Sequence, residues 1–252
     1  MEVPGSDRPD TGCLEAIRRD WDARAKEDAR HYINWPDIPN DEGAFFESGR
    51  VDYRRFVLAF FRRMGFEPPG KAALEIGCGI GRIARWMAQD FATYMGVDVS
   101  PEMVRKASEY AIPNATFRTV SGADLSGIAS ASVDFVFSFA VFQHVPDKAA
   151  ILNYFSETAR VLRPGGVFRL QMKGLSALKF GTTAIEAGLT EKRFGGMRLP
   201  FVRVRRLDTW QGRSIAPGEA IRECTSRGLK VEDVEGRWTV MMWVGGRKSE
   251  PQ

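Results

Sequence analysis

Two carboxylates, Glu75 and Asp98, flank a glycine-rich stretch and are well suited to bind a polar ligand. Asp98 follows the first glycine by roughly 20 positions, the separation expected for an acid that hydrogen-bonds the hydroxyls of a ribose. The glycines fall at alternate positions, where they let the backbone turn tightly and lie against a ligand. They are Gly77, Gly79 and Gly81. This spacing predicts a nucleotide-binding half-site.

The details of this stretch discriminate among nucleotide ligands. A dinucleotide fingerprint needs a third glycine three positions after Gly79, and that position is Arg82. No Gly-Lys-Ser/Thr sequence follows, so a loop that cradles a triphosphate is not supported. Glu75, at the end of an apolar run, would repel a pyrophosphate but would accept hydrogen bonds from an ammonium group. The pattern favours a ligand with a cationic amino-acid end and argues against a nicotinamide-dependent dehydrogenase.

Four segments of the chain resemble, in order, successive motifs of the class I S-adenosylmethionine-dependent methyltransferases. They are Leu-Glu-Ile-Gly-Cys-Gly-Ile-Gly-Arg at 74–82, Gly-Val-Asp-Val-Ser-Pro-Glu-Met at 96–103, Ser-Val-Asp-Phe-Val-Phe-Ser at 132–138 and Arg-Pro-Gly-Gly at 163–166. The similarity runs from about 72 to 168. Four motifs in register are far more specific than any one of them, and they imply S-adenosylmethionine as the cofactor.

By this resemblance, the glycine turn faces the methionine part of the cofactor, Asp98 holds the ribose hydroxyls, and Val99 and Met103 pack on the adenine. The resemblance assigns these residues to the cofactor site: Glu75, Gly77, Cys78, Gly79, Gly81, Arg82, Asp98, Val99, Met103, Gly122, Ala123, Asp124, Phe139 and Ala140.

The contact to the adenine amino group is the part of this assignment where the chain departs from the family's commoner form. Many relatives carry an acid two to four residues before the apolar position that Leu125 matches, whereas here Asp124 directly precedes it. Backbone groups of Gly122 and Ala123 are an alternative source of the contact. Asp124 is equally well interpreted as a helix N-cap or turn residue.

His144 is the candidate catalytic residue. It lies just beyond the fourth predicted strand, at the carboxyl edge where open α/β sheets bind ligands, and imidazole titrates near neutral pH. Methyl transfer from a sulfonium chiefly needs a nucleophile held close, in line and dry. A hydroxyl or ammonium acceptor must also lose a proton, which a base would take. A structural role for His144, capping the next helix or lining the cofactor pocket, is the open alternative.

Neither a metal site nor a nucleic-acid partner is predicted. Two histidines and three scattered cysteines form no Cys-x-x-Cys pair and no histidine cluster, which favours cation-independent catalysis. The Asn/Asp-Pro-Pro-aromatic segment of amino-methylating nucleic-acid enzymes is absent after the fourth strand, where the chain reads Phe-Ala-Val-Phe at 139–142. A basic stretch at 192–206 is compatible with phosphate or partner binding, but a solvated edge strand is the simpler interpretation.

Composition and charge bound the remaining possibilities. The net charge of +4 is too small to demand a nucleic-acid partner, and a hydrophobic content of 44% is ordinary for a folded core. Three cysteines, an odd number, indicate a reducing compartment without a disulfide framework. No segment approaches the roughly 20 apolar residues that span a bilayer, and residues 1–12 lack the apolar run of a signal peptide. These features predict a cytoplasmic protein with no membrane association and leave the oligomeric state open.

The elements that must position these residues alternate between strand and helix. Strands are predicted at 72–76, 93–97, 115–120, 135–139, 166–171, 229–234 and 238–244, and helices at 82–89, 101–110, 148–162 and 217–227. The predicted fold class is α/β, a Rossmann-like doubly wound, mostly parallel seven-stranded sheet with an antiparallel C-terminal hairpin strand and an N-terminal helical lid.

The predicted domain organisation has three parts. Residues 1–12 form a flexible tail, and residues 13–66 form a helical cap with helices at 13–33 and 51–64, joined by a loop at 34–49 long enough to be a lid. Residues 67–248 form the cofactor-binding domain, with a substrate or lid insertion at about 176–212. Trp21 and Tyr32 of the first helix are interpreted either as lid contacts or as plain core.

The resemblance predicts an S-adenosylmethionine-dependent methyltransferase that acts on the oxygen or nitrogen of a small-molecule acceptor. A cofactor-binding regulatory or assembly module without catalysis remains an alternative, as does an RNA or protein methyltransferase. Aromatic residues in the least regular segments suggest a planar or hydrophobic acceptor, or simply pack; they are Phe45, Phe46, Phe180, Phe194 and Trp210. Cofactor motifs do not choose among acceptor atoms.

Overall fold

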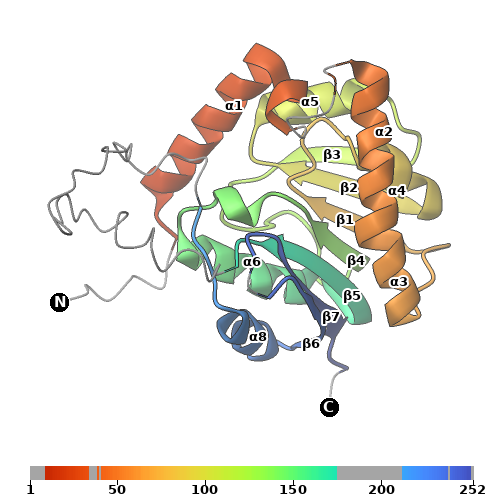
Figure 1. Cartoon of the computed structure of the whole chain (residues 1–252), viewed down its shortest axis with the longest axis vertical. Helices are drawn as coiled ribbons and strands as arrows, with labels where there is room; N and C mark the ends of the chain where they lie inside the picture. Colours follow the sequence, from red (N-terminus) through yellow and green to blue (C-terminus); the bar gives the residue numbers. More distant parts are fainter. Residues whose placement is uncertain (1–8, 34–38, 40, 175–211, 238, 251–252) are drawn as a thin grey trace, which may run out of the picture.

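The computed structural model describes residues 9–33, 39, 41–174, 212–237 and 239–250. Within them, one mixed sheet has the strand order β3-β2-β1-β4-β5-β7-β6 (Figure 1). Its strands are β1 Ala72–Ile76, β2 Thr93–Asp98, β3 Ala115–Thr119, β4 Val133–Ser138, β5 Leu162–Met172, β6 Leu229–Glu235 and β7 Met242–Lys248. Strand β7 runs antiparallel to both β5 and β6, and the other pairings are parallel. The predicted fold class is confirmed.

Helices cover both faces of this sheet. In Figure 1, α2, α3 and α4 lie on one side of it, and α6 and α8 lie on the other. The helices are α1 Thr11–Ile33, α2 Glu42–Asp52, a π-helix Tyr53–Leu58, α3 Ala59–Met64, α4 Ala84–Asp90, α5 Pro101–Glu109, a short 3-10 helix Phe142–His144, α6 Lys148–Val161 and α8 Pro217–Thr225. Successive strand residues point to opposite faces, so Ala73 joins the core with Phe60 and Met87, while Leu74 joins Ile151 and Phe155.

Local capping explains where several helices begin. The Ser100 hydroxyl accepts a hydrogen bond from the Met103 N–H (3.1 Å), and Pro101 occupies the first turn, as predicted for α5. The Asp147 carboxylate accepts from the Ala149 N–H (2.9 Å) at the start of α6. Helix α4 begins at Ala84, two residues later than predicted, because the glycine turn extends further along the chain.

Helix α1 begins at Thr11, two residues inside the predicted tail, where the Asp10 carboxylate accepts from the N–H groups of Gly12 and Cys13. The helix is kinked at Asp28, which has φ −159° and ψ 88°. The Asp28 carboxylate accepts from the His31 N–H (3.2 Å), so a second N-cap restarts the helix after the kink. Residues 1–8 of the predicted tail lie outside the described residues.

The predicted loop at 34–49 is wrong over its second half, because α2 begins at Glu42. Asp41 is the N-cap and accepts from the Ala44 N–H (2.9 Å), and Phe45 and Phe46 are buried. Burial of these aromatic side chains outweighs the weak helix propensity of the two glycines in the segment. Residues 34–38 and 40 lie outside the described residues.

The last strand, β7, begins four residues later than predicted, at Met242 rather than at 238. A turn precedes it: the Thr239 N–H donates to the Gly236 carbonyl (2.9 Å), and Gly236 has a φ of 61°. The insertion at 176–212 falls almost wholly outside the described residues. Among the helices that the structure does describe, none has the length and apolar character needed to cross a bilayer.

Candidate functional site

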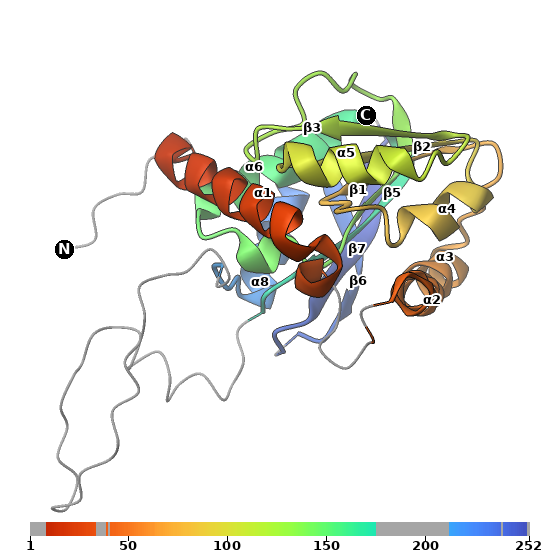
Figure 2. The ribbon, with the colours of Figure 1, turned by 90° about the horizontal axis from the view of Figure 1, so that it is seen from above.

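A cavity of about 670 Å³ opens at the carboxyl ends of β1, β2 and β4. Its wall includes the glycine turn, Glu75, Asp98, the loop after β4 and the inner side of α1. Helix α1 lies beside α5 in both ribbon views (Figures 1 and 2). Residues from distant parts of the chain therefore converge on one site, at the sheet edge where the sequence placed it.

The glycine turn needs glycine at its first position for a steric reason. Gly77 has a φ of 74°, and a Cβ there would lie 2.0 Å from Cγ2 of Val141. The N–H groups of Gly77 and Cys78 both donate to the Val97 carbonyl, at 2.7 and 3.0 Å. The backbone of the turn is thus fixed against β2 and against the loop after β4, with its surface exposed to the cavity.

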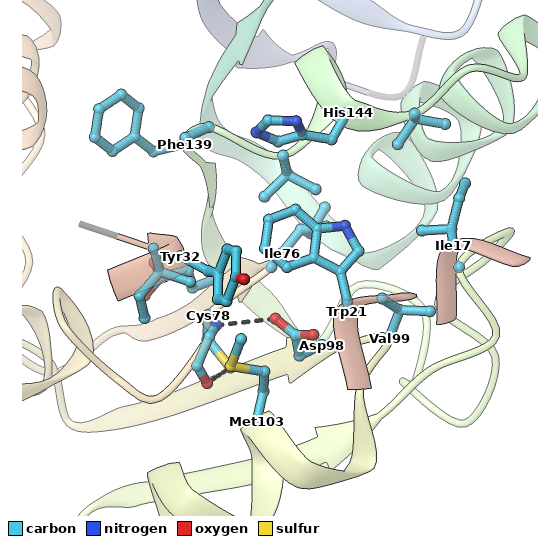
Figure 3. A pocket seen from close by; sticks show the side chains of 18 of the residues that line it. Ile17, Trp21, Tyr32, Ile76, Cys78, Asp98, Val99, Met103, Phe139 and His144 are labelled. Carbon is cyan, nitrogen blue, oxygen red and sulfur yellow. Dashed lines mark hydrogen bonds between the residues drawn. The ribbon is translucent and has the colours of Figure 1, made fainter. Parts of the chain in front are cut away.

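Asp98 is held by backbone donors on both carboxylate oxygens. Oδ2 accepts from the Gly79 N–H at 2.9 Å (Figure 3). Oδ1 accepts from the Ser100 N–H, also at 2.9 Å. Burial raises the pKa of Asp98, and these N–H groups oppose that rise by stabilising the carboxylate. The remaining lone pairs of a carboxylate fixed in this way are suited to accept hydrogen bonds from two adjacent hydroxyls.

Glu75 is more deeply buried and has a different partner. The Tyr94 hydroxyl donates a hydrogen bond to Oε2 of Glu75. Burial raises the pKa of Glu75 to about 7, although the Tyr94 hydroxyl and the Arg82 charge both act in the opposite direction. A cationic group arriving in the cavity would find here a carboxyl able to ionise in response.

Arg82 links the turn to the helical cap. Its Nη1 lies 2.7 Å from Oδ2 of Asp52 and donates to the Ser48 hydroxyl at 3.1 Å. A Cβ on Gly49 would lie 2.1 Å from the Arg82 carbonyl oxygen, so α2 approaches the turn closely only because residue 49 is glycine. This ion pair is almost completely buried and fixes α2 beside the cavity. No sequence pattern points to Asp52, because its contact with Arg82 is set by packing.

The apolar end of the cavity contains Val99, Met103 and Gly122, as predicted, together with Leu14 and Ile17 of α1. These side chains form a slot suited to a flat, hydrophobic ring. The predicted residues Gly81, Ala123 and Asp124 are absent from the cavity wall among the residues that the structure describes.

The hydrogen bonds of the Asp124 side chain are those expected of a turn residue. Its Oδ1 accepts from the Ser126 N–H at 3.0 Å and from the Ser121 hydroxyl at 3.2 Å. The Ala123 carbonyl accepts from the Asn153 side chain at 2.8 Å. Of the three predicted positions 122–124, Gly122 is the one that reaches the cavity wall.

The loop after β4 carries the candidate catalytic residue. Ala140 has a φ of 59°, an uncommon conformation for a residue with a side chain, and its N–H donates to Oε1 of buried Gln171 (2.9 Å). His144 ends this loop in the 3-10 helix, with Nε2 lying 3.1 Å from the Gln143 amide nitrogen. Phe139, Ala140 and His144 all line the cavity, as predicted.

Helix α1 supplies a further wall of the cavity. The Trp21 ring lies between Asp98 and His144 in Figure 3, and its centroid is 5.3 Å from that of the His144 imidazole. The Arg24 guanidinium packs over the rings of both Trp21 and Tyr32. Trp21 and Tyr32 both line the cavity, and Trp21 also packs against the hydrophobic core, so the positions of these residues fit both interpretations. Arg24 is a wall residue that the sequence did not single out.

Residues 74–170 match the family model described as a methyltransferase domain. The match covers the glycine turn, Asp98 and the loop after β4. A methyltransferase domain thus occupies residues 74–170 of this chain.

Relatives of this chain include 2-methyl-6-phytyl-1,4-hydroquinone methyltransferase of Synechocystis sp., 36% identical over 126 residues, or 48% of this chain and 38% of that protein. Ubiquinone biosynthesis O-methyltransferase of Xanthomonas axonopodis pv. citri is 28% identical over 173 residues, or 68% of this chain and 67% of that protein. The chain thus spans well under half the length of the first relative.

Solved structures support the fold of this methyltransferase domain. Magnesium protoporphyrin IX methyltransferase from Synechocystis, with bound SAH, superposes with a TM-score of 0.63 at 20% identity, covering 93% of this chain and 99% of that one. The DhpI–SAH complex gives a TM-score of 0.60 at 18% identity, covering 96% and 100%. At these identities the likeness establishes the fold alone.

Proposed function

We propose that this chain binds S-adenosylmethionine in the cavity and catalyses transfer of its methyl group to an oxygen or nitrogen atom of a small-molecule acceptor, without a metal ion. The observation that carries the proposal is the presence of two buried carboxyl groups, Glu75 and Asp98, on one wall around a glycine-rich turn. A cofactor with an ammonium group at one end and ribose hydroxyls in its middle matches this arrangement.

Each part of the cofactor has complementary residues. Glu75 would take the ammonium group, Asp98 the ribose hydroxyls, and Val99, Met103 and Ile17 the adenine. Gly77 would let the methionine portion approach the backbone, since any Cβ there would meet Val141. These assignments use donors, acceptors and apolar surface that already line the cavity.

The bound cofactor supplies an activated methyl group on its sulfonium, so the chain chiefly has to position and dehydrate the acceptor. Trp21, Tyr32 and Phe139 line the cavity and would exclude water around a bound acceptor. Positioning of this kind contributes on the order of 7–11 kcal/mol in favourable cases. His144, beside Trp21, would accept the proton that a hydroxyl or amine loses.

Metal independence and a small-molecule acceptor are finer parts of the proposal. Among the described residues, no group of three or more His, Cys, Asp or Glu side chains is placed to hold a metal ion. The cavity is largely apolar and of the size typical for small ligands. Two relatives are named for ring-bearing quinone or hydroquinone chemistry, which is compatible with a planar acceptor.

Calorimetry with S-adenosylhomocysteine tests cofactor binding. Asp98→Asn should weaken binding by about tenfold or more, because a charged acceptor of hydroxyl hydrogen bonds is lost, while Asp124→Asn should bind like the wild type. Formation of S-adenosylhomocysteine from S-adenosylmethionine with panels of phenols and amines then tests catalysis, with and without a chelator. Binding without transfer to any panel member would favour the non-catalytic module, and a chelator-sensitive rate would contradict metal independence.

A further inference from the structure

Glu75 has a protein partner that lies on the neighbouring strand. The Tyr94 hydroxyl donates to its Oε2, and both side chains are buried, with 1% of Tyr94 and 4% of Glu75 exposed. The parallel register pairs Ala73 with Tyr94 and Glu75 with Gly96, so Tyr94 and Glu75 share one face of the sheet. Because Gly96 has no side chain, the Tyr94 phenol can extend past it toward Glu75.

The neighbours of Gly96 make this arrangement specific. A Cβ at Gly96 would lie 2.8 Å from the Phe117 ring and 2.9 Å from Cβ and Sγ of Cys78. The Tyr94 ring itself packs 6.0 Å from that of Phe117. The phenol is thus held by packing in the position from which it donates to Glu75.

Charged groups from the turn and from β2 surround the same carboxyl. Arg82 favours its ionised form, but the Arg82 charge is shared with Asp52 at 2.7 Å. Asp98 opposes ionisation of Glu75, and the buried Cys78 thiol, whose pKa is raised, stays neutral. The pKa of Tyr94 is also raised by burial, so its hydroxyl remains a donor. Tyr94 is therefore a neutral group that stabilises the Glu75 carboxylate at close range.

We infer that Tyr94 is a positioning residue for the cofactor: its phenol fixes one oxygen of Glu75, leaves the other for the ammonium group, and favours the ionised carboxyl. The inference rests on the proposed function, because it needs a cofactor with an ammonium group. When that group binds, the Glu75 carboxyl releases its proton to solvent and becomes a carboxylate.

The expected pH dependence follows from the direction of each effect. Below a pH of about 7, Glu75 is protonated in the free protein, so binding must displace a proton and the affinity falls by up to about tenfold per pH unit. Removing the Tyr94 hydroxyl raises the pKa of Glu75 further, since that hydrogen bond lowers it. The decline in affinity should then begin at a higher pH.

The test is the dissociation constant of S-adenosylhomocysteine for the full chain, measured by calorimetry between about pH 6 and pH 8.5. Tyr94→Phe should bind about tenfold more weakly near pH 7 and approach the wild type at the alkaline end. The matched control is Tyr53→Phe, because Tyr53 is also buried and donates to a carboxylate, Asp90 (2.6 Å), but lies away from the cavity wall. It should leave the profile unchanged.

A second arm tests whether Tyr94 acts through Glu75. In a Glu75→Gln background, Tyr94→Phe should change the affinity little, and proton release on binding should disappear. An unchanged affinity in Tyr94→Phe, or an equal loss at every pH, would overturn the inference, because a packing defect has no pH signature. If Tyr94→Phe does not fold, a fluorotyrosine at position 94, a more acidic donor, should shift the decline to lower pH; an unshifted profile overturns the inference. Absence of binding by the wild type would instead refute the proposed function.

Discussion

Two carboxyl groups in one cavity behave differently because their hydrogen-bond partners differ. Asp98 accepts hydrogen bonds from two backbone N–H groups at 2.9 Å. The turn and the start of α5 fix the positions of these donors. Glu75 accepts a hydrogen bond from the Tyr94 phenol and is more completely buried than Asp98. Fixed backbone dipoles keep Asp98 suited to neutral hydroxyls, whereas Glu75 gains most from a cationic ligand. The two ends of the ligand are thus distinguished by charge.

His144 gives a prediction at the residue scale. If it accepts the acceptor's proton, His144→Gln should lower turnover by about 10²–10⁴-fold and leave the affinity for S-adenosylhomocysteine within about twofold. Single-turnover kinetics and calorimetry measure the two quantities separately. The control is His31→Gln, which alters the other histidine on the cavity wall. A folded His144→Gln variant with normal turnover would leave His144 with the structural role only.

Sequence reasoning found the residues whose roles depend on local pattern. Glycine spacing and the end of a strand are enough to place Gly77 and Asp98, because the turn that joins them to a ligand is built from adjacent residues. It missed Tyr94 and Gln171, whose contacts cross between strands, and Arg24, which reaches the cavity from α1. Those roles come from packing of residues that are distant in sequence, and no spacing rule reports them.

At the scale of elements, α1 is fastened to the helix that follows Asp98. Oδ1 of Asp22 accepts from the Ser100 hydroxyl and from the Glu102 N–H, each at 3.0 Å. Nζ of Lys106 donates to the Ala25 carbonyl at 2.7 Å. These contacts join the wall formed by α1 directly to the segment that positions Asp98. Movement of α1 away from the cavity would have to break them.

Loosening this attachment should speed release of the ligand. Asp22→Ala removes both hydrogen bonds at the N-terminus of α5, a change worth about 0.5–2 kcal/mol, and should raise the dissociation rate of S-adenosylhomocysteine by up to about tenfold. Stopped-flow tryptophan fluorescence measures this rate. Lys26→Ala is the control, because it deletes the exposed ion pair with Asp22 (2.7 Å) but keeps the two α5 contacts. Equal rates in all three proteins would show that α1 does not govern exit.

The same element scale explains the wrong loop prediction at 34–49. Pro36, Gly43 and Gly49 weigh against a helix when the sequence is taken alone. Gly49 is required by a tertiary contact, since a Cβ would lie 2.1 Å from the Arg82 carbonyl oxygen. Gly49 thus lowers the helix propensity of α2 but allows α2 to approach the glycine turn. The sequence pattern alone does not reveal this tertiary contact.

For the whole molecule, the parallel centre of the sheet and the C-terminal hairpin were predictable, whereas the bounds of the last strand, β7, were not. Runs such as Ala72–Ile76 are apolar because helices cover both of their faces, which gives a strong local signal. Gly245 and Gly246 lower strand propensity, so the prediction ended the last strand at Val244. In the fold, a Cβ at Gly245 would lie 2.6 Å from the Phe60 ring. The sheet therefore packs closely against α3 at this glycine.

Gly246 offers a test of whether the packing of β6 against β7 tolerates an added side chain. A Cβ at this position would lie 1.9 Å from the Lys230 carbonyl oxygen, beside the register shift between Val231 and Asp233. Because that oxygen is backbone, Gly246→Ala must displace β6 and should lower the free energy of unfolding by about 1–3 kcal/mol or more. Urea denaturation followed by circular dichroism measures the change. Gly218 lies inside α8, and in Gly218→Ala the new Cβ would lie 3.7 Å from the flexible end of the Arg222 side chain, so this control should be neutral or stabilising by up to about 1 kcal/mol. Equal stability of the two variants would mean that β6 yields to the new side chain without cost.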